Sequence, residues 1–316
     1  MRIHKGVISL YQIGVDIGGT SIKIGLVDEQ LHIVQRTSIP FPMIGGEGVA
    51  KLLAETVRNF LEEHDVSIED IHHVGVVVPG SIDPTGGIIL DAHNLDFHDV
   101  PFRDQLEHAF GSMAVYLAND ADGAALAELG RGAFAGHKTG VLLTLGTGVG
   151  GGVILDGKMF SGGCRRGIEL GHMQIVSGGE LCTCGVRGCI EAYCSATALI
   201  RDAAKAAKEH PESDLAKADD MTAKYAIDCA KAGDPTAKAV FDQYVDHLAA
   251  ACVSVVHLLD PEVIAIGGGV SHAGDFLFEP LRKKTLEKCF FDSHGEIVPA
   301  VMGNDAGIIG AAMLGL

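Results

Sequence analysis

Residues 13–27 read Ile-Gly-Val-Asp-Ile-Gly-Gly-Thr-Ser-Ile-Lys-Ile-Gly-Leu-Val, and they show how the chain begins to fold. The apolar, β-branched run Val7–Val15 is interrupted by Asp16-Ile17-Gly18-Gly19-Thr20, and Ile22–Val27 then resumes with alternating residues. Two short β-type runs around a glycine pair are typical of a hairpin. The sequence therefore predicts a strand, a glycine turn and a second strand, followed by a third antiparallel strand at Leu31–Ser38.

The glycine turn of this hairpin is a candidate phosphate site. Gly18 and Gly19 carry no side chains, so backbone N–H groups there can approach phosphate oxygens closely. The Thr20 hydroxyl adds a donor, and Asp16 can orient Mg²⁺ through water. The alternative is an ordinary glycine hairpin without a ligand, which this motif alone does not exclude.

A second hairpin of the same kind begins at Val141–Leu145, continues through Gly146-Thr147-Gly148-Val149-Gly150-Gly151-Gly152 and returns at Val153–Leu155. Gly146-x-Gly148-x-x-Gly151 matches the dinucleotide-binding fingerprint, but that fingerprint requires a helix after the glycines. A β-branched strand follows instead, so a second phosphate hairpin fits better. Two such hairpins about 130 residues apart predict two halves of related architecture that face each other.

Other segments alternate between strand and helix patterns, which indicates an α/β protein. We expect strands at 74–78, 114–117 and 263–266, helices at 47–64, 102–110, 121–129, 196–208, 223–232, 235–259 and 306–314, and a polar surface loop at 209–220.

Composition restricts the class of protein. The chain has 316 residues, 47% of them apolar, which is enough for one large or two moderate domains. Its net charge of −17 comes without a Lys/Arg cluster, so neither nucleic acid nor an anionic membrane is an expected partner. The first dozen residues show no secretory pattern, no apolar run has membrane-spanning length, and the clustered cysteines would oxidise in a secretory compartment. We therefore expect a cytoplasmic protein.

Residues 172–191 contain a candidate metal site. Cys182, Cys184 and Cys189 form C-x-C-x4-C, and His172 lies upstream. Three thiolates and one imidazole complete a tetrahedral Zn²⁺ shell without an open position, so the zinc would be structural. Gly185 and Gly188 would permit the tight turns that this knuckle needs. The alternative is three reduced thiols and a surface histidine.

Acidic and amide residues lie near these motifs. Glu169 and Glu191 flank the zinc ligands, and the zinc would fix carboxylates that contact something else. Asn119-Asp120 follows a predicted strand, where ligands bind in open α/β sheets, although a helix N-cap explains it equally well. Gly267-Gly268 suits either a close approach of adenosine or a plain turn, and Asn94 alone reads as a loop residue.

Together these motifs outline phosphoryl transfer, because two glycine hairpins would hold a nucleotide while acids grip a polyol. No G-x4-G-K-[ST] is present, which excludes a P-loop enzyme. The chain resembles the ROK family of sugar kinases and repressors, from Asp16-Ile-Gly-Gly-Thr20 to Asn304–Ala312. The resemblance implies an actin-like, hexokinase-like ATPase fold of two ribonuclease-H-like domains around a cleft. The expected domains are 1–118 with the C-terminal helix 303–316, and 119–302.

The resemblance also implies roles for the residues named above. Zinc ligands fall on His172, Cys182, Cys184 and Cys189, and sugar contacts on Asn94, Asn119, Asp120, Glu169, His172 and Glu191. ATP contacts fall on Asp16, Gly18, Gly19, Thr20, Gly146, Thr147, Gly148, Gly267 and Gly268. Asp120 would be the base that deprotonates the sugar 6-hydroxyl as it attacks the γ-phosphate of Mg-ATP, most simply with glucose as the acceptor.

Two features weaken the case for glucose itself. Asp122 adds negative charge near the base, and the loop Asp91–His98 is charged, with Phe97 where glucokinases often carry Trp. A kinase for N-acetylmannosamine, N-acetylglucosamine, allose or fructose is the alternative. A non-catalytic ROK repressor is less consistent with the sequence, since both glycine hairpins are intact and only fifteen residues precede Asp16. The resemblance further implies a homo-oligomer, dimer or tetramer.

Overall fold

The computed structural model describes residues 11–316 except 84, 112 and 165–166, and these form two compact units. The first unit runs to Ala135 and includes Met159–Ile168 and Asn304–Leu316, and the second comprises Gly136–Lys158 and Glu169–Gly303. The domain boundary expected at 118/119 stays a prediction, although helix α3 (Asp120–Arg131) groups with the first unit.

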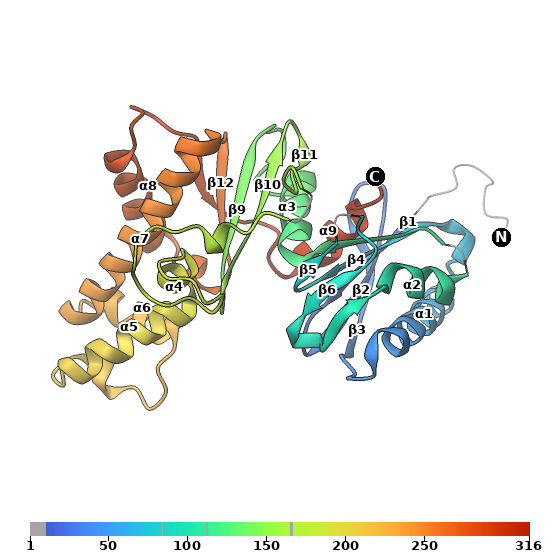
Figure 1. The fold of residues 1–316 in the computed structure, drawn as a ribbon, viewed down its shortest axis with the longest axis horizontal. Coiled ribbons are helices and arrows are strands. Elements are labelled where there is room, and N and C mark those ends of the chain that lie inside the picture. Colours follow the sequence, from blue (N-terminus) through green and yellow to red (C-terminus); the bar gives the residue numbers. More distant parts are fainter. Residues whose placement is uncertain (1–10, 84, 112, 165–166) are drawn as a thin grey trace, which may run out of the picture. The chain divides into compact units, whose positions relative to one another are not determined.

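The first unit is built on a five-stranded sheet in the order β3-β2-β1-β4-β8 (Figure 1). Its strands are β1 (Tyr11–Ile17), β2 (Ser21–Val27), β3 (Ile33–Pro40), β4 (Ile71–Val78) and β8 (Val115–Asn119). The predicted hairpin and its third strand are confirmed, because β1–β2 and β2–β3 pair antiparallel. Strands β4 and β8 extend the sheet in parallel. Residues 7–10 of the predicted first strand lie outside the described residues.

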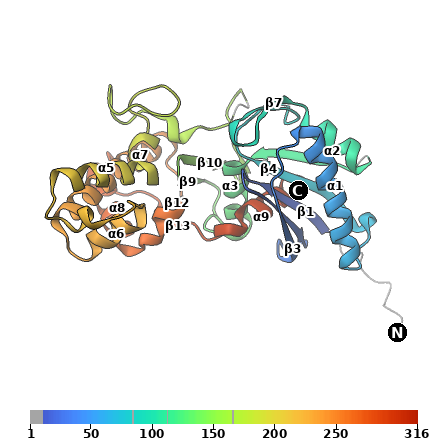
Figure 2. The ribbon, with the colours of Figure 1, turned by 90° about the horizontal axis from the view of Figure 1, so that it is seen from below.

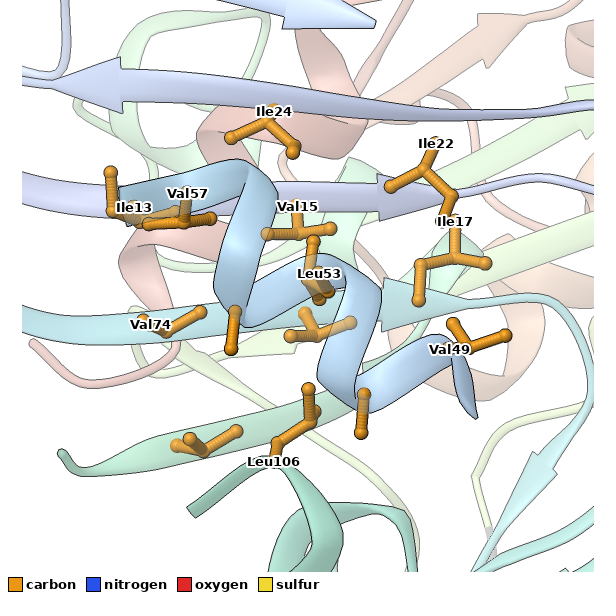
Figure 3. Close-up of a cluster of buried hydrophobic side chains, with 14 of the residues drawn as sticks. Ile13, Val15, Ile17, Ile22, Ile24, Val49, Leu53, Val57, Val74 and Leu106 are labelled. Atoms are coloured by element: carbon orange, nitrogen blue, oxygen red, sulfur yellow. The ribbon is translucent and has the colours of Figure 1, made fainter. Parts of the chain in front are cut away.

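One face of this sheet is covered by α1 (Gly45–Glu63) and α2 (Phe102–Phe110), which lie side by side in both views (Figures 1 and 2). Because successive strand side chains point to opposite faces, alternate residues of β1 reach this helical layer. The resulting cluster of buried side chains, shown in Figure 3, includes Ile13, Val15, Ile17, Ile22, Ile24, Val49, Leu53, Val57, Val74 and Leu106. This core fixes the positions of β1 and β2, the two strands of the first hairpin.

The intervening residues of β1 and β4 include two glycines that let the C-terminal helix α9 (Ala306–Met313) approach. A Cβ at Gly14 would lie 2.0 Å from the carbonyl oxygen of Ile308, and one at Gly75 would lie 1.7 Å from that of Ala311. Any larger residue would therefore displace the helix backbone. The close packing makes α9 part of the first unit, far from α1 in sequence.

A small three-stranded sheet leads away from the end of β4. It contains β5 (Ser81–Ile82), β6 (Ile89–Ala92) and β7 (Phe97–Val100), in the order β5-β6-β7. The sequence did not predict this sheet. Its strands are too short for a readable alternation, and turn-forming residues separate them. Short 3₁₀ turns lie at Ile68–Asp70 and at His93–Leu95, and the second of these carries Asn94.

The second unit repeats the sheet plan of the first. Its order is β11-β10-β9-β12-β13, with β11 (Lys158–Met159), β10 (Val149–Leu155), β9 (Gly140–Leu145), β12 (Val263–Gly267) and β13 (Glu296–Pro299). Strands β9 and β10 form an antiparallel glycine hairpin, and β12 and β13 follow in parallel, as β4 and β8 do in the first unit. The related architecture predicted for the two halves is thus confirmed by their matching strand orders.

Helices of the second unit are α4 (Glu191–Cys194), α5 (Ala196–Glu209), α6 (Ala223–Lys231), α7 (Pro235–Leu259) and α8 (Asp275–Lys288). Short 3₁₀ turns lie at Leu170–His172, Asp214–Lys217, Gly269–Ala273 and Gly303–Asp305. In the described part of the chain, no helix has both the length and the apolar character needed to cross a membrane.

The sequence interpretation of 209–220 as a polar surface loop was wrong in part. Ser213 and Leu215 are buried, and Asp214–Lys217 forms a 3₁₀ turn. The Asp234 carboxylate accepts hydrogen bonds from the Ser213 hydroxyl at 2.9 Å and from the Asp214 N–H at 2.8 Å. A tertiary contact therefore draws this polar segment onto the start of α7.

Candidate active site

The first glycine hairpin lies against the loop that carries Asn94. The Gly18 N–H donates to the Ser21 carbonyl at 2.9 Å and closes the turn between β1 and β2. A Cβ placed on Gly19 would lie 3.4 Å from the Cβ of Asn94. The structure thus brings a predicted phosphate residue and a predicted sugar residue into contact within the first unit.

Asp16 ends up paired with a cation that the sequence interpretation did not include. Lys23 Nζ lies 2.9 Å from Asp16 Oδ2, because the antiparallel register places these two residues opposite each other on β1 and β2. The Asp16 side chain is 18% exposed and that of Lys23 is 42% exposed. The hairpin register could have identified Lys23 in advance, since it fixes which residues lie opposite each other.

Asn119 and Asp120 lie where β8 ends and α3 begins. Asn119 Oδ1 accepts from the Ala121 N–H at 2.8 Å, and Asp120 Oδ1 accepts from the same group at 2.9 Å. The N-cap predicted for this pair is therefore found at Asn119, and Asp120 is the first residue of the helix. The Asp120 residue is exposed, and its carboxylate lies at a helix N-terminus, where negative charge is favoured.

The other end of the Asn119 amide holds a neighbouring turn. Asn119 Nδ2 donates to the Gly80 carbonyl at 2.7 Å. Gly80 has a φ of +109°, and a Cβ there would lie 2.1 Å from the carbonyl oxygen of Asp91. Gly80 is thus packed on the strand that leads to Asn94, so Asn119 links the start of α3 to the Asn94 loop.

The four predicted zinc ligands come together in the second unit. The ligand atoms of His172, Cys182, Cys184 and Cys189 all lie within 4.8 Å of one another. His172 Nδ1 lies 3.6 Å from Cys182 Sγ, and Cys184 Sγ lies 3.7 Å from Cys189 Sγ. A tetrahedral Zn²⁺ with Zn–S of about 2.3 Å and Zn–N of about 2.05 Å has edges of about 3.6 Å (S to N) and about 3.8 Å (S to S). The two observed distances agree with such a shell, and Nδ1 is the imidazole nitrogen of His172 that lies next to Cys182 Sγ.

Glycines form the turns of this cysteine knuckle, the segment Cys182–Cys189. Gly185 and Gly188 have φ of +84° and +91°, and a Cβ at Gly188 would lie 1.8 Å from the Val176 carbonyl oxygen. The expected need for glycine at both positions is confirmed. Burial and the adjacent thiols of Cys184 and Cys182 raise the pKa of Cys189 to about 12. Metal binding would therefore release protons from the knuckle.

Glu191 connects the cysteine knuckle to the second glycine hairpin. Its Oε1 accepts from the Thr183 hydroxyl at 2.6 Å and from Cys182 Sγ at 3.3 Å, and its Oε2 accepts from the Val149 N–H at 3.1 Å. A Cβ at Gly148 would lie 2.4 Å from Oε2. Burial raises the pKa of Glu191, but these hydrogen bonds outweigh it and hold that pKa below its ordinary value.

Glu169 and His172 are placed by the same hairpin. The 3₁₀ turn Leu170–His172 packs on β10, where a Cβ at Gly171 would lie 2.0 Å from the Val149 carbonyl oxygen. Glu169 precedes this turn and is exposed, whereas His172 is half-buried. The second hairpin therefore contacts Glu191 and also the turn that follows Glu169, which are the two predicted sugar-binding acids of this unit.

The tip of the second hairpin is held by the first turn of α5. The Ala196 N–H donates to the Gly146 carbonyl at 2.8 Å, and the Thr197 hydroxyl donates to the Thr147 carbonyl at 2.8 Å. Gly268, with a φ of +82°, packs on the end of β9, and a Cβ there would lie 2.4 Å from the Leu145 carbonyl oxygen. The predicted phosphate and adenosine motifs are therefore adjacent in the second unit.

Comparison with known proteins agrees with this arrangement. The ROK family model matches residues 12–316. The chain belongs to the ROK family. The paired sheets of matching order are accordingly the two ribonuclease-H-like halves of the hexokinase-like ROK fold.

Relatives and solved structures of ROK proteins cover almost the whole chain. A glucokinase from Thermotoga maritima is 40% identical over 310 residues, which is 96% of each protein. A ROK hexokinase from Thermus thermophilus is 33% identical with a TM-score of 0.83, covering 96% of this chain and 97% of that one. A ROK family glucokinase from Streptomyces griseus, solved with glucose and AMPPNP, is 35% identical with a TM-score of 0.78, covering 96% and 98%.

Proposed function

We propose that this ROK protein is an ATP-dependent hexose kinase that transfers the γ-phosphate of ATP to the 6-hydroxyl of glucose. The observation that carries this proposal is the same in each unit: a glycine hairpin lies directly against polar residues suited to a sugar. Gly19 contacts Asn94 in the first unit, and Gly148 contacts Glu191 in the second. The similarity to glucokinases at 40% identity, and to a glucokinase solved with glucose and an ATP analogue, supports glucose as the acceptor.

In this proposal Asp120 is the general base. It accepts the proton of the 6-hydroxyl while that oxygen attacks the γ-phosphorus and the bond to the β-phosphate oxygen breaks, leaving ADP. Asp120 lies in the first turn of α3, at the end of the helix where the helix dipole interacts favourably with negative charge. The proposed sugar-binding residues are Asn94, Asn119 and Asp120 in the first unit and Glu169, His172 and Glu191 in the second.

The two hairpins would bind the nucleotide. Gly18 and Gly146 shape the two turns, because their N–H groups donate to the carbonyls of Ser21 and Gly148. Gly19 and Thr20 would supply donors to phosphate from the first hairpin, and Thr147 and Gly148 from the second. The carbonyls of Gly146 and Thr147 are bonded to the first turn of α5, which fixes the backbone of the second hairpin at its tip. Gly267 and Gly268 would approach the adenosine. Mg²⁺, held near Asp16, would neutralise phosphate charge.

We further propose that Cys182, Cys184 and Cys189 of the cysteine knuckle bind structural Zn²⁺ together with His172. The ligand set and the two measured edges fit a closed tetrahedral shell. Zinc there would fix the knuckle from which Glu191 reaches the second hairpin. With Nδ1 on the metal side, His172 keeps Nε2 for a sugar hydroxyl.

Phe97, the aromatic residue of the loop Asp91–His98, does not decide which sugar is the acceptor. Phe97 is 1% exposed and packs against the rings of Phe41 and Phe102, so it belongs to the core of the first unit. Its replacement of a tryptophan therefore gives no argument against glucose. Asp122 is half-buried on α3 and adds a negative charge near Asp120. Other hexoses and N-acetylhexosamines are therefore compared with glucose as acceptors.

The test is a coupled ADP-release assay with Mg-ATP and a panel of hexoses and N-acetylhexosamines. We expect glucose to be phosphorylated, and Asp120→Asn to lower kcat by several orders of magnitude while sugar binding is retained. Asp219→Asn, at an exposed position outside the candidate site, is the matched control. No phosphorylation of any sugar by the folded protein would contradict the proposed function, and near-normal turnover by Asp120→Asn would remove Asp120 as the base.

A further inference from the structure

Thr183 lies between two predicted zinc ligands and has no role among the predicted site residues. It is exposed, and its hydroxyl donates a hydrogen bond to Glu191 Oε1 at 2.6 Å. Cys182 Sγ is the other group bonded to the same oxygen, at 3.3 Å. Oε1 therefore depends on two donors, one a hydroxyl and one a thiol.

The two donors contribute unequally to holding Oε1. A thiol is a weak hydrogen-bond donor, whereas a hydroxyl that donates to a carboxylate forms a short, charge-assisted bond, in line with the distances of 3.3 Å and 2.6 Å. Among the contacts of Oε1 that the described residues make, the Thr183 hydroxyl is therefore the stronger side-chain donor.

The other oxygen of Glu191 reaches the second hairpin. Oε2 accepts from the Val149 N–H at 3.1 Å, directly beside Gly148. A carboxylate oxygen has two acceptor lone pairs, so Oε2 keeps one for a sugar hydroxyl. Rotation of the carboxylate would break the bond to Val149 as well as move the sugar acceptor.

We propose that Thr183 is a positioning residue: its hydroxyl holds the Glu191 carboxylate in a link between the cysteine knuckle and the second glycine hairpin. Through this link, sugar bound at Glu191 and nucleotide bound at the hairpin strengthen each other's binding. Such coupling is reciprocal by thermodynamic necessity, because it is one free energy shared by both ligands. The inference rests on the proposed function, which places sugar at Glu191 and phosphate at Gly146–Gly148.

The test is titration calorimetry of the zinc-loaded protein with glucose and with a non-hydrolysable ATP analogue, each alone and in the presence of the other. Thr183→Val removes the hydroxyl and keeps the branched shape, and Thr183→Ser keeps the hydroxyl. Thr56→Val is the matched control, because the Thr56 hydroxyl donates only to the Leu52 carbonyl within α1. Zinc content and melting temperature are measured for all four proteins.

We expect Thr183→Val to bind glucose about tenfold more weakly, since a hydrogen bond to a charged group is lost. Its nucleotide affinity should gain little from glucose, whereas the unaltered protein and Thr183→Ser should gain several-fold. Zinc content and melting temperature should stay near those of Thr56→Val.

Three results would overturn the inference while leaving the kinase proposal standing. These are unchanged binding and coupling in Thr183→Val, an equal defect in Thr183→Ser, or loss of zinc from Thr183→Val, which would make Thr183 a structural residue of the knuckle. Absence of glucose binding by the unaltered protein would instead contradict the proposed function, and the coupling with it.

Discussion

The Asn119 side chain donates from Nδ2 to the Gly80 carbonyl oxygen at 2.7 Å, while its Oδ1 caps α3. Both ends of the amide are thus used inside the first unit. The bond joins the start of the helix that carries Asp120 to the turn before the Asn94 loop. A sugar contact by Asn119 stays a prediction, and it would have to share the amide with these bonds.

Replacing Asn119 with aspartate tests this link. The carboxylate can still accept the Ala121 N–H, but it cannot donate to Gly80 and would repel the carbonyl oxygen. We expect a loss of stability of about 1–3 kcal/mol, and weaker binding of every acceptor sugar, because the Asn94 loop loses an anchor. Urea unfolding and hydrogen exchange of residues 80–95 are the measurements. Weakened binding of one sugar epimer alone, with normal exchange in the loop, would instead show a direct contact.

Cys184→Ala is expected to lower the bound zinc well below one equivalent. Losing one thiolate opens the shell, and binding free energy that stabilised the second unit is lost with it, on the order of several kcal/mol. Elemental analysis and thermal unfolding measure both effects. Cys164→Ala, at an exposed cysteine outside the knuckle, is the control. A variant that keeps full zinc and stability would show that the site is not structural.

Gly268→Ala is expected to destabilise the second unit by about 2 kcal/mol or more. The residue has φ of +82°, and the new Cβ would lie 2.4 Å from the Leu145 carbonyl oxygen, where only backbone movement relieves the clash. Nucleotide affinity should fall as well, since β9 leads directly into Gly146. At the neighbouring Gly269 a Cβ would meet nothing within 4 Å, so Gly269→Ala should stay near neutral in denaturant unfolding. Equal effects at both positions would contradict this account.

Acidification should weaken the anchoring of α9 through His73. The His73 ring is fully buried, and its Nε2 lies 2.8 Å from the Ala312 carbonyl oxygen, which requires the proton on Nε2. Burial lowers the pKa of His73, the bond to Ala312 opposes this, and the neighbouring His72 lowers it further. The folded state therefore takes up a proton later than the unfolded chain does.

The sign follows from linkage: stability is present above the ordinary histidine pKa of about 6.5 and is lost as pH falls below it. Unfolding free energies at pH 7.5 and pH 5.5 should differ more for the unaltered protein than for His73→Gln. His32→Gln, at a largely exposed histidine, should behave like the unaltered protein. An equal pH response in His73→Gln would exclude His73 as the cause.

Long, strongly patterned elements were predicted well from the sequence. The predicted helix 235–259 coincides with α7 and the predicted helix 102–110 with α2, because an N-terminal proline in α7 and a C-terminal glycine after α2 mark their ends. Helix α8 was missed, since Pro280 lies inside it and its polar residues hide the apolar face. The strands β5, β6 and β7 were missed because two to four residues show no period.

Candidate site residues could also be predicted from the sequence where a single local motif contains them. The cysteine knuckle contains three of the four candidate zinc ligands, and His172 lies ten residues before it. Gly185 and Gly188 indicate the turns of the knuckle, so little tertiary information was needed to predict that these residues lie close together. The same holds for both hairpins, whose strands are adjacent in the chain. The sequence by itself therefore determined the α/β class, the repeated hairpin and the ligand set.

Only the tertiary structure decided which of these motifs touch. The Asn119 amide donates to the Gly80 carbonyl, and Gly148 packs against the Glu191 carboxylate. The Thr183 hydroxyl donates to that same carboxylate. No periodicity in the sequence relates the residues of these contacts. Local pattern records which face of an element is apolar, because that depends on neighbours within one or two turns. Contacts between distant loops depend instead on how whole sheets and helices pack, and single hydrogen bonds there leave no trace in residue spacing.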